Sequence, residues 1–146
     1  NAWLFSKSLQ TLPVRMERHC DNAEASAGFL GDHPNVNFAK YPFHKNHPQQ
    51  ELARRQMKRG GGVVCFEISG GYEAAKTFID RVEMLSRSAN LGDTRTIVTH
   101  PASTTHSKLT DEERQAVGIT PGMIRIAVGL ESTEDIIGDV KQALES

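Results

Sequence analysis

The segment Val63–Ile68 constrains the fold of this chain more than any other. Its residues Val-Val-Cys-Phe-Glu-Ile are almost all apolar, follow three consecutive glycines, and end at a Ser-Gly-Gly turn. A short apolar run between turn residues is typical of a central strand that is covered on both faces. We therefore expect a layered domain in which helices pack on a sheet with this segment near its centre.

Helical and strand-like patterns alternate along the rest of the chain. The strand-like segments are 36–41, 95–99 and 123–130, and the last of these alternates strictly between apolar and other residues. The helical segments are 3–30, with a kink at Pro13, then 48–57, 72–85 and 133–144. The prediction is an α/β domain of the α+β kind, with a mostly antiparallel sheet of about four strands flanked by helices, most economically on one face.

The length of 146 residues corresponds to one ordinary domain. Chain ends are usually loosely held, whereas helical apolar spacing is already present in Asn1–Phe5. This start predicts that upstream sequence has been removed and that the chain, residues 1–146, is one domain of a longer protein. Residues 1–30 are expected to form a long helix and residues 31–146 a small α/β domain.

Charge and cysteine content restrict the classes of partner. The chain has 17 basic and 18 acidic residues that are interspersed, which argues against nucleic acid or an anionic membrane surface and favours a small polar metabolite. No apolar run approaches the roughly 18 to 20 residues that span a bilayer. Cys20 and Cys65 lack metal-ligand spacing, as expected in a reducing compartment. We expect a cytoplasmic protein.

Several loop residues have the composition of a reactive site without its spacing. Gly60–Gly62 precedes a strand and is not followed by Gly-Lys-Ser or Gly-Lys-Thr, so it predicts a turn and not a phosphate-binding loop. His100, His106 and Asp111 do not have the spacing of a metal site, and none is predicted. Adjacent loop residues such as Ser103–His106 rarely supply the geometry of a catalytic triad, so we expect turn and capping contacts there.

Arg125 is a stronger candidate, because its strand commits the opposite face to the core. Its own face carries Met123, Ala127 and Gly129, of which the last two are small and leave room beside the guanidinium. A guanidinium with free space beside it can bind a carboxylate in bidentate fashion. The residue pattern alone leaves open whether Arg125 binds such a ligand or simply faces solvent.

Three groups of residues resemble the pyridoxal-phosphate enzymes of cysteine and methionine metabolism. They are Met16-Glu17-Arg18-His19, then Asn90–Asp93 followed by Thr99–His106, and finally Ile124–Glu131. Their order and spacing make the likeness extend over the whole chain, to the C-terminal part of that family. The resemblance implies the fold of aspartate aminotransferase, in which a cofactor-binding domain, absent from this chain, precedes a C-terminal domain with a helix-flanked sheet. It implies that this chain is that C-terminal domain of a longer enzyme, with residues 1–30 as the linking helix, and that it cannot carry a full reaction by itself.

The resemblance also assigns roles to residues. In the family, pyridoxal 5'-phosphate forms a Schiff base with a lysine in a Ser-x-Thr-Lys-like segment upstream of this region, and none of the lysines here has that setting. We therefore expect no catalytic or cofactor-binding residue and no bound cofactor in this chain. The resemblance places the substrate's α-carboxylate on Arg125 and Asn90, which would orient the bonds of Cα for reaction.

The combination of Asn90 and Arg95 resembles the residues found in the O-succinylhomoserine and O-acetylhomoserine sulfhydrylases. These enzymes replace an acyloxy group at Cγ by sulfide in methionine and homocysteine biosynthesis. The expected partners are an acylhomoserine or sulfur amino acid and sulfide, in a homotetrameric parent. We hypothesise that Arg95 favours the acidic side chain of O-succinylhomoserine, the alternative being a surface arginine. The alternative functions of the parent protein are those of a methionine or cystathionine γ-lyase or γ-synthase. In another class, the chain is a non-catalytic α/β dimerisation module.

Overall fold

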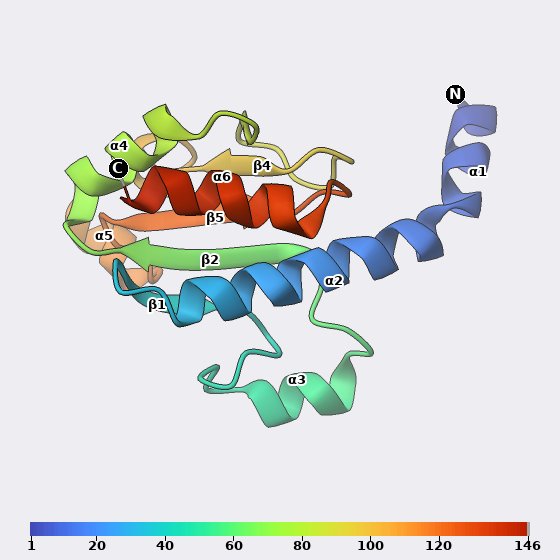
Figure 1. The fold of residues 1–146 in the computed structure, drawn as a ribbon, viewed down its shortest axis with the longest axis horizontal. Coiled ribbons are helices and arrows are strands. Elements are labelled where there is room, and N and C mark those ends of the chain that lie inside the picture. The colour runs from blue at the N-terminus through green and yellow to red at the C-terminus, as the bar shows by residue number, and fades with distance from the viewer. Residues whose placement is uncertain (146) are drawn as a thin grey trace.

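The structure is a computed structural model that describes residues 1–145, and its sheet has five strands (Figure 1). The strands are β1 (Val36–Lys40), β2 (Val63–Ile68), β3 (Ser86–Arg87), β4 (Ile97–Thr99) and β5 (Met123–Ala127). They lie in the order β1-β2-β5-β4-β3, and all neighbours are antiparallel except the parallel pair β3 and β4. The predicted α/β class is confirmed. The sheet is mixed, with one more strand than expected.

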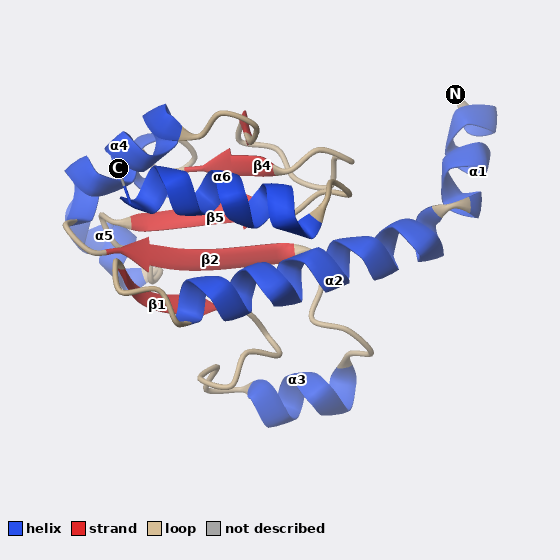
Figure 2. Ribbon diagram, in the orientation of Figure 1, coloured by secondary structure: helices blue, strands red, loops and turns tan. Residues whose placement is uncertain are grey.

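Three helices, α2, α4 and α6, cover one face of the sheet (Figure 2). The shorter helices α3 and α5 lie at the periphery, and a 3-10 turn, η1, follows β4. The expectation that helices cover one face is therefore confirmed. The helices are α1 (Ala2–Gln10), α2 (Leu12–Gly31), α3 (Gln50–Gln56), α4 (Gly71–Arg81), η1 (Pro101–Ser103), α5 (Asp111–Ala116) and α6 (Thr133–Glu145).

The main core lies between these three helices and the sheet. Strand β2 is central as expected, and its side chains Val64, Phe66 and Ile68 are buried there. The expected burial of β2 on both faces is wrong, because Val63 is 37% exposed and Cys65 and Glu67 are only half-buried. A smaller apolar cluster covers part of the second face, made by Phe38, Ala102, Ile119 and Met123.

The predicted linking helix is broken in two at Thr11. Proline has no N–H, and its ring clashes with the carbonyl four residues earlier, so Pro13 is tolerated at the start of α2 but not inside one continuous helix. The interruption is thus stronger than the predicted kink. Helix α1 turns away from α2 and projects from the body of the domain, with Trp3, Phe5 and Leu9 exposed (Figure 1).

Helix α4 ends at Arg81, four residues before the predicted end. The carboxylate of Asp139 on α6 accepts hydrogen bonds from the backbone N–H groups of Glu83, Met84 and Leu85, at 2.9 to 3.0 Å. In a longer helix these N–H groups would bond to backbone carbonyls of the preceding turn, and here Asp139 replaces those carbonyls as their acceptor. Two strands are also shorter than predicted. Strand β4 begins at Ile97 and not at Arg95, and β5 ends at Ala127 and not at Leu130.

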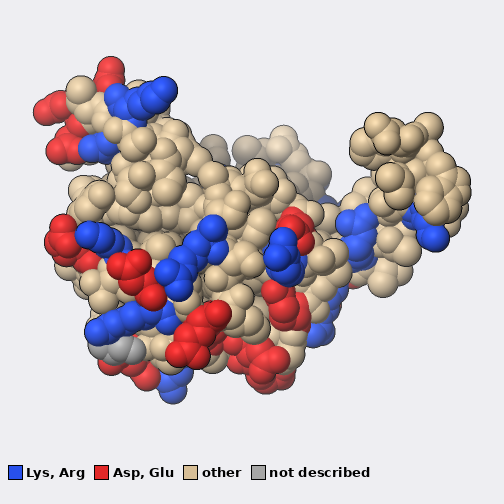
Figure 3. All heavy atoms as spheres, turned by 90° about the horizontal axis from the view of Figure 1, so that it is seen from above, with Lys and Arg blue, Asp and Glu red and all other residues tan. Residues whose placement is uncertain are grey.

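Charges of both signs are interspersed over the face of the body shown in Figure 3, while the projecting α1 end is mostly uncharged. Among the described residues, no helix is both long and apolar enough to cross a membrane.

Candidate functional site

Arg125 lies in the middle of β5 and points to the sheet face opposite the three covering helices. Its strand neighbours Ile124 and Ile126 are fully buried in the core, and side chains alternate between faces along a strand. Across the sheet, Arg125 is paired with Cys65 on β2 and with Thr99 on β4. The sequence pattern therefore placed Arg125 on the correct face.

The guanidinium of Arg125 holds the loop that follows β3. Its Nη2 donates to the backbone carbonyl oxygens of Ala89, at 2.7 Å, and of Asn90, at 3.3 Å. Among the described residues, no acceptor contacts Nε or Nη1. One end of the planar group is thus fixed by the protein, and the remaining N–H groups can bind a planar acceptor such as a carboxylate.

The same loop is tied to β4. The hydroxyl of Thr99 donates to the carbonyl oxygen of Ser88, and the N–H of Ser88 donates to the carbonyl of Val98 at 3.3 Å. Two of the three predicted site residues, Arg125 and Asn90, are therefore brought together, although the observed contact uses the backbone of Asn90. The side chain of Asn90 is exposed.

Arg95, the third predicted residue, is not part of this group. Its side chain is 71% exposed, and its Nη2 donates to Asp93 Oδ2 at 3.1 Å. A second hydrogen bond joins the backbone N–H of Arg95 to Asp93 Oδ1 at 3.1 Å. These hydrogen bonds hold the pKa of Asp93 at about 2. No contact joins Arg95 to Arg125 or Asn90 among the described residues, and its charge is partly offset by Asp93.

Cys65 was missed by the sequence analysis as a member of this site. Burial raises the pKa of its thiol, and the positive charges of Arg125 and Lys40 oppose that rise. Lys40, Cys65, Arg125 and Thr99 are consecutive cross-strand partners, so they form one row across the sheet. Only the strand register shows this row, because the four residues are far apart in the sequence.

Gly129 lets the end of the loop approach β5 closely. A Cβ atom at this position would lie 2.5 Å from the carbonyl carbon of Arg95 and 2.5 Å from the carbonyl oxygen of Thr94. Real Cβ atoms do not approach backbone atoms so closely. The glycine that the sequence analysis regarded as space beside Arg125 is instead covered by the 94–95 backbone.

The histidine and hydroxyl residues after β4 have structural contacts, as predicted. No cluster of His, Cys, Asp or Glu in residues 1–145 could hold a metal ion. His100 is buried, its Nε2 lies 2.8 Å from the carbonyl oxygen of Pro121, and its Nδ1 lies 2.9 Å from the hydroxyl of Ser103. Because a carbonyl only accepts, Nε2 carries the proton and Nδ1 accepts from Ser103. The pair stabilises the η1 turn.

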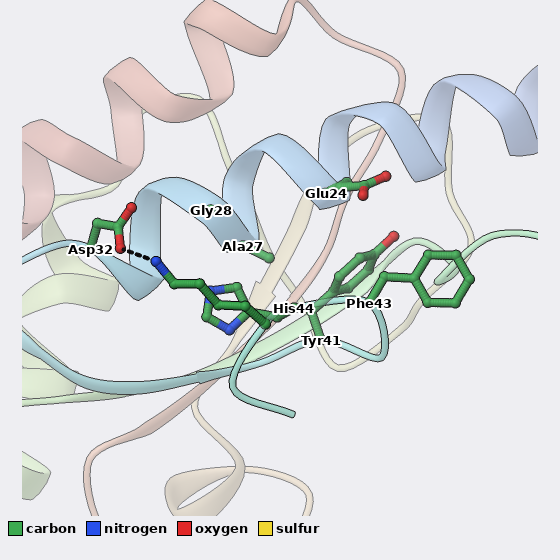
Figure 4. A pocket seen from close by; sticks show the side chains of 8 residues that line it. Glu24, Ala27, Gly28, Asp32, Tyr41, Phe43 and His44 are labelled. Atoms are coloured by element: carbon green, nitrogen blue, oxygen red, sulfur yellow. Dashed lines mark hydrogen bonds and ion pairs between the residues drawn. The ribbon is translucent and has the colours of Figure 1, made fainter. Parts of the chain in front are cut away.

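Gly60–Gly62 forms an irregular connection with a bend at Gly62 before β2, where a turn was predicted. The Tyr41 hydroxyl donates to the carbonyl of Gly61 at 3.1 Å, and burial raises the pKa of Tyr41. Tyr41 lines a hollow of about 210 Å³ between α2 and the segment after β1, where Lys45 pairs with Asp32 at 3.2 Å (Figure 4). None of the residues lining that hollow belongs to the Arg125 group.

A second hollow, of about 280 Å³, adjoins the Arg125 loop. Leu91 and Ala127 both line it, and they are next to Asn90 in the loop and two residues from Arg125 on β5. Residues two apart on a strand share a face. The hollow therefore lies on the same face of β5 as Arg125, although Arg125 itself does not line it. Its main apolar lining is Leu12, Met16, Val63, Leu91, Ala127 and Val128.

Comparison with known proteins identifies the family of the chain. Residues 1–145 match the family of Cys/Met metabolism PLP-dependent enzymes. The chain belongs to this family. It is 48% identical over 144 residues to an L-methionine gamma-lyase of Treponema denticola, covering 99% of this chain and 36% of that protein. It is 45% identical over 148 residues to an O-acetyl-L-homoserine sulfhydrylase of Leptospira meyeri, covering 100% and 34%.

A solved structure shares the fold of this family member over its whole length. The Campylobacter jejuni protein assigned as an O-acetylhomoserine (thiol)-lyase has a TM-score of 0.94 and 42% identity, covering 100% of this chain and 35% of that one. Its crystal structure contains N'-pyridoxyl-lysine-5'-monophosphate. The family is PLP-dependent, and the chain spans about a third of the length of the relatives it matches.

The lysines of this chain do not fit covalent attachment of that cofactor. All seven are exposed. Lys45 and Lys141 pair with carboxylates on the surface, and Lys7 and Lys40 lie over the aromatic rings of Trp3 and Phe38.

Proposed function

We propose that this chain is the C-terminal, substrate-carboxylate-binding domain of a PLP-dependent homoserine-ester sulfhydrylase. The observation that carries the proposal is the guanidinium of Arg125, which is fixed at one end by Ala89 and Asn90 and has free N–H groups at the other. Family membership supports an amino-acid substrate, whose α-carboxylate has the planar geometry that a guanidinium binds best. The PLP-binding domain belongs to the rest of the parent enzyme.

Binding of the α-carboxylate by Arg125 does more than contribute affinity. When bound, pyridoxal phosphate withdraws electrons from the substrate's Cα. Which Cα bond is aligned for reaction depends on how the substrate is held, and the rigid loop 88–91 limits rotation of the guanidinium. We propose that the share of this domain in catalysis is orientation, with the side chain of Asn90 as a second polar contact for the carboxylate.

The proposed reaction is a replacement at Cγ of an O-acylhomoserine. Sulfide forms the new C–S bond, the Cγ–O bond breaks, and the acyl group leaves as its carboxylate. The apolar hollow beside Leu91 suits the aliphatic Cβ and Cγ of such a substrate. The combination of Asn90 with Arg95 favours the sulfhydrylases over cystathionine-handling enzymes.

A methionine γ-lyase is the second candidate, because relatives of that name reach 48% identity, against 45% for an acetylhomoserine sulfhydrylase. The lyase reaction uses the same α-carboxylate contact and differs in the fate of the side chain, which leaves as a thiol without replacement.

Product analysis separates the two. The full-length enzyme, loaded with pyridoxal phosphate, is incubated either with O-acetylhomoserine or O-succinylhomoserine plus sulfide, or with methionine alone. We expect homocysteine from at least one ester and little methanethiol from methionine. Rapid release of methanethiol with no homocysteine would overturn the sulfhydrylase proposal in favour of the lyase. Inactivity in both assays would overturn both candidates.

A further inference from the structure

A buried polar cluster connects the end of β5 to the loop beside Arg125, and neither substrate-binding residue belongs to it. The half-buried carboxylate of Glu131 accepts two hydrogen bonds from Thr96, one from its backbone N–H at 2.6 Å and one from its hydroxyl at 2.8 Å. The Thr96 hydroxyl in turn accepts from the N–H of Gly129 at 2.8 Å. Thr96 is fully buried, so its hydrogen-bonding capacity is satisfied within the protein.

Thr96 marks the point where the loop after β3 returns to the sheet. One end of this loop, Ala89–Asn90, is held by Arg125. The other end is held by Glu131 through Thr96 and by the N–H of Leu130, which donates to the carbonyl of Thr94 at 2.8 Å. Strand β5 and its continuation therefore hold both ends of the loop against which the guanidinium is seated.

We propose that Glu131 is a positioning residue for the carboxylate site, which sets the loop 89–95 and thereby the orientation of Arg125. The proposal rests on the function proposed above and names the residue that preorganises its binding site. Glu131 does not touch the substrate. Its effect passes through Thr96 to the loop, and from Ala89 and Asn90 to the guanidinium.

A carboxylate is required at this position because Thr96 presents two donors to it. Each oxygen of Glu131 takes one of these donors. A glutamine has only one acceptor oxygen, so its NH2 group would face one of the two Thr96 donors where an acceptor is needed. Glu131→Gln therefore leaves one buried donor unpaired while preserving the size of the side chain.

Helix α2 holds the same segment from the other side. Asn22 is fully buried, and its Nδ2 donates to the carbonyl oxygens of Gly129, at 3.0 Å, and Glu131, at 2.9 Å. Arg18 donates to the carbonyl of Glu131 at 3.0 Å, and His19 Nδ1 donates to the carbonyl of Val128 at 2.6 Å. The segment that carries Glu131 is thus fixed before any substrate binds, as positioning requires.

The test compares two ligands of the full-length holoenzyme that differ only in the carboxylate. Norleucine carries the α-carboxylate, and norleucinamide replaces it by an uncharged amide. For Glu131→Gln we expect the inhibition constant of norleucine to rise by about five- to tenfold, the effect of loosening one charge-assisted contact, and that of norleucinamide to change by less than about twofold. Glu134→Gln is the matched control, because Glu134 is exposed and its carboxylate accepts from the hydroxyl of Ser132 and does not contact Thr96.

An unchanged ratio of the two inhibition constants in Glu131→Gln, with a lowered melting temperature, would overturn the proposal and leave Glu131 a purely structural role. If Glu131→Gln does not fold, Thr96→Val removes the hydroxyl's hydrogen bonds with Glu131 and Gly129 but keeps the backbone hydrogen bond to Glu131, and it must shift the ratio in the same direction. Arg125→Ala distinguishes failure of the carboxylate-binding function from failure of the positioning role of Glu131. If it leaves the ratio unchanged, the carboxylate-binding function itself fails, whereas a change there with none in Glu131→Gln or Thr96→Val refutes the positioning role alone.

Discussion

Arg125 and Ala89 are joined by a 2.7 Å hydrogen bond from the guanidinium Nη2 to the backbone carbonyl oxygen. The two residues are 36 positions apart and lie on different elements, so the contact fixes a loop and a strand relative to each other. It also aims the remaining N–H groups of the guanidinium. A lysine could not do both, because its single ammonium has no planar fork.

Asp139 should matter for stability more than other acidic residues of the chain. Asp139→Asn keeps the size of the side chain but loses one acceptor oxygen, so at least one of the three N–H groups, of which that of Leu85 is buried, loses its partner. We expect the free energy of unfolding to fall by about 1–3 kcal/mol, measured by urea denaturation. Asp80→Asn, at an exposed position on α4, is the control and should change it by less than about 0.5 kcal/mol.

The difference in the free energy of unfolding between wild type and Asp139→Asn should depend on pH. Burial works to raise the pKa of Asp139, but hydrogen bonds from the backbone of Glu83, Leu85 and Met84 and from Gln142 lower it overall. A carboxyl group with a lowered pKa contributes stability above its unfolded pKa of about 3.9, and loses it as pH falls through the lower folded value. The gap between wild type and Asp139→Asn should therefore narrow below about pH 4. A gap that widens on acidification would contradict this role.

Gly129 and Gly138 should respond oppositely to alanine. At Gly129 the new methyl group would meet the backbone of Thr94 and Arg95 at 2.5 Å, so we expect Gly129→Ala to destabilise by about 1–3 kcal/mol. At Gly138 on α6 the methyl group meets nothing within 4 Å, and alanine favours a helix, so a gain of about 0.5–1 kcal/mol is expected. Equal effects in thermal or urea unfolding would show that the 94–95 backbone does not need the glycine.

Arg95 should influence the acyl preference only weakly, since Asp93 already pairs with it on the surface. For Arg95→Ala we expect the ratio of kcat/KM for O-succinylhomoserine to that for O-acetylhomoserine to fall by about two- to fivefold, the range of an exposed ion pair. Asp93→Asn should raise the same ratio. Arg55→Ala, an exposed arginine on α3, is the control. An unchanged ratio in Arg95→Ala would leave Arg95 without a role in specificity.

The chain alone should not bind pyridoxal phosphate covalently. Its seven lysines are exposed, and none has the family's Ser-x-Thr-Lys-like setting. Titration of the purified chain with the cofactor is expected to give no absorption band near the visible edge beyond that of the free cofactor with surface amines. A saturable band at one equivalent would contradict the proposed division between this domain and the rest of the enzyme.

The sequence predicted those features that depend on local periodicity. Strict alternation around Ile124 and Ile126 placed β5 and the direction of Arg125 correctly. The early end of α4 was not predictable, because it depends on Asp139, more than 50 residues further along. Strand β3 has only two polar residues, Ser86 and Arg87, and no apolar pattern.

In the candidate site, too, features with a local sequence signal were predicted and features that depend on distant contacts were not. Arg125 was singled out by its strand pattern and Asn90 by the family resemblance, while the residues that hydrogen-bond around them were not predicted. Cys65 and Thr99 became neighbours of Arg125 only through the strand register. Glu131 lies inside a motif that was noticed, but its role depends on a contact with Thr96 across 35 positions. Side chains that act through tertiary hydrogen bonds leave no local signal in the sequence.

The central claim is that Arg125 binds the substrate's α-carboxylate, and the direct test is the inhibition of the full-length holoenzyme by norleucine and norleucinamide before and after Arg125→Ala. We predict that the variant binds norleucine about 100-fold more weakly, the loss of a charge-assisted bidentate contact, while its affinity for norleucinamide changes by less than about threefold. An equal loss for both ligands, or no loss for norleucine, would contradict the claim.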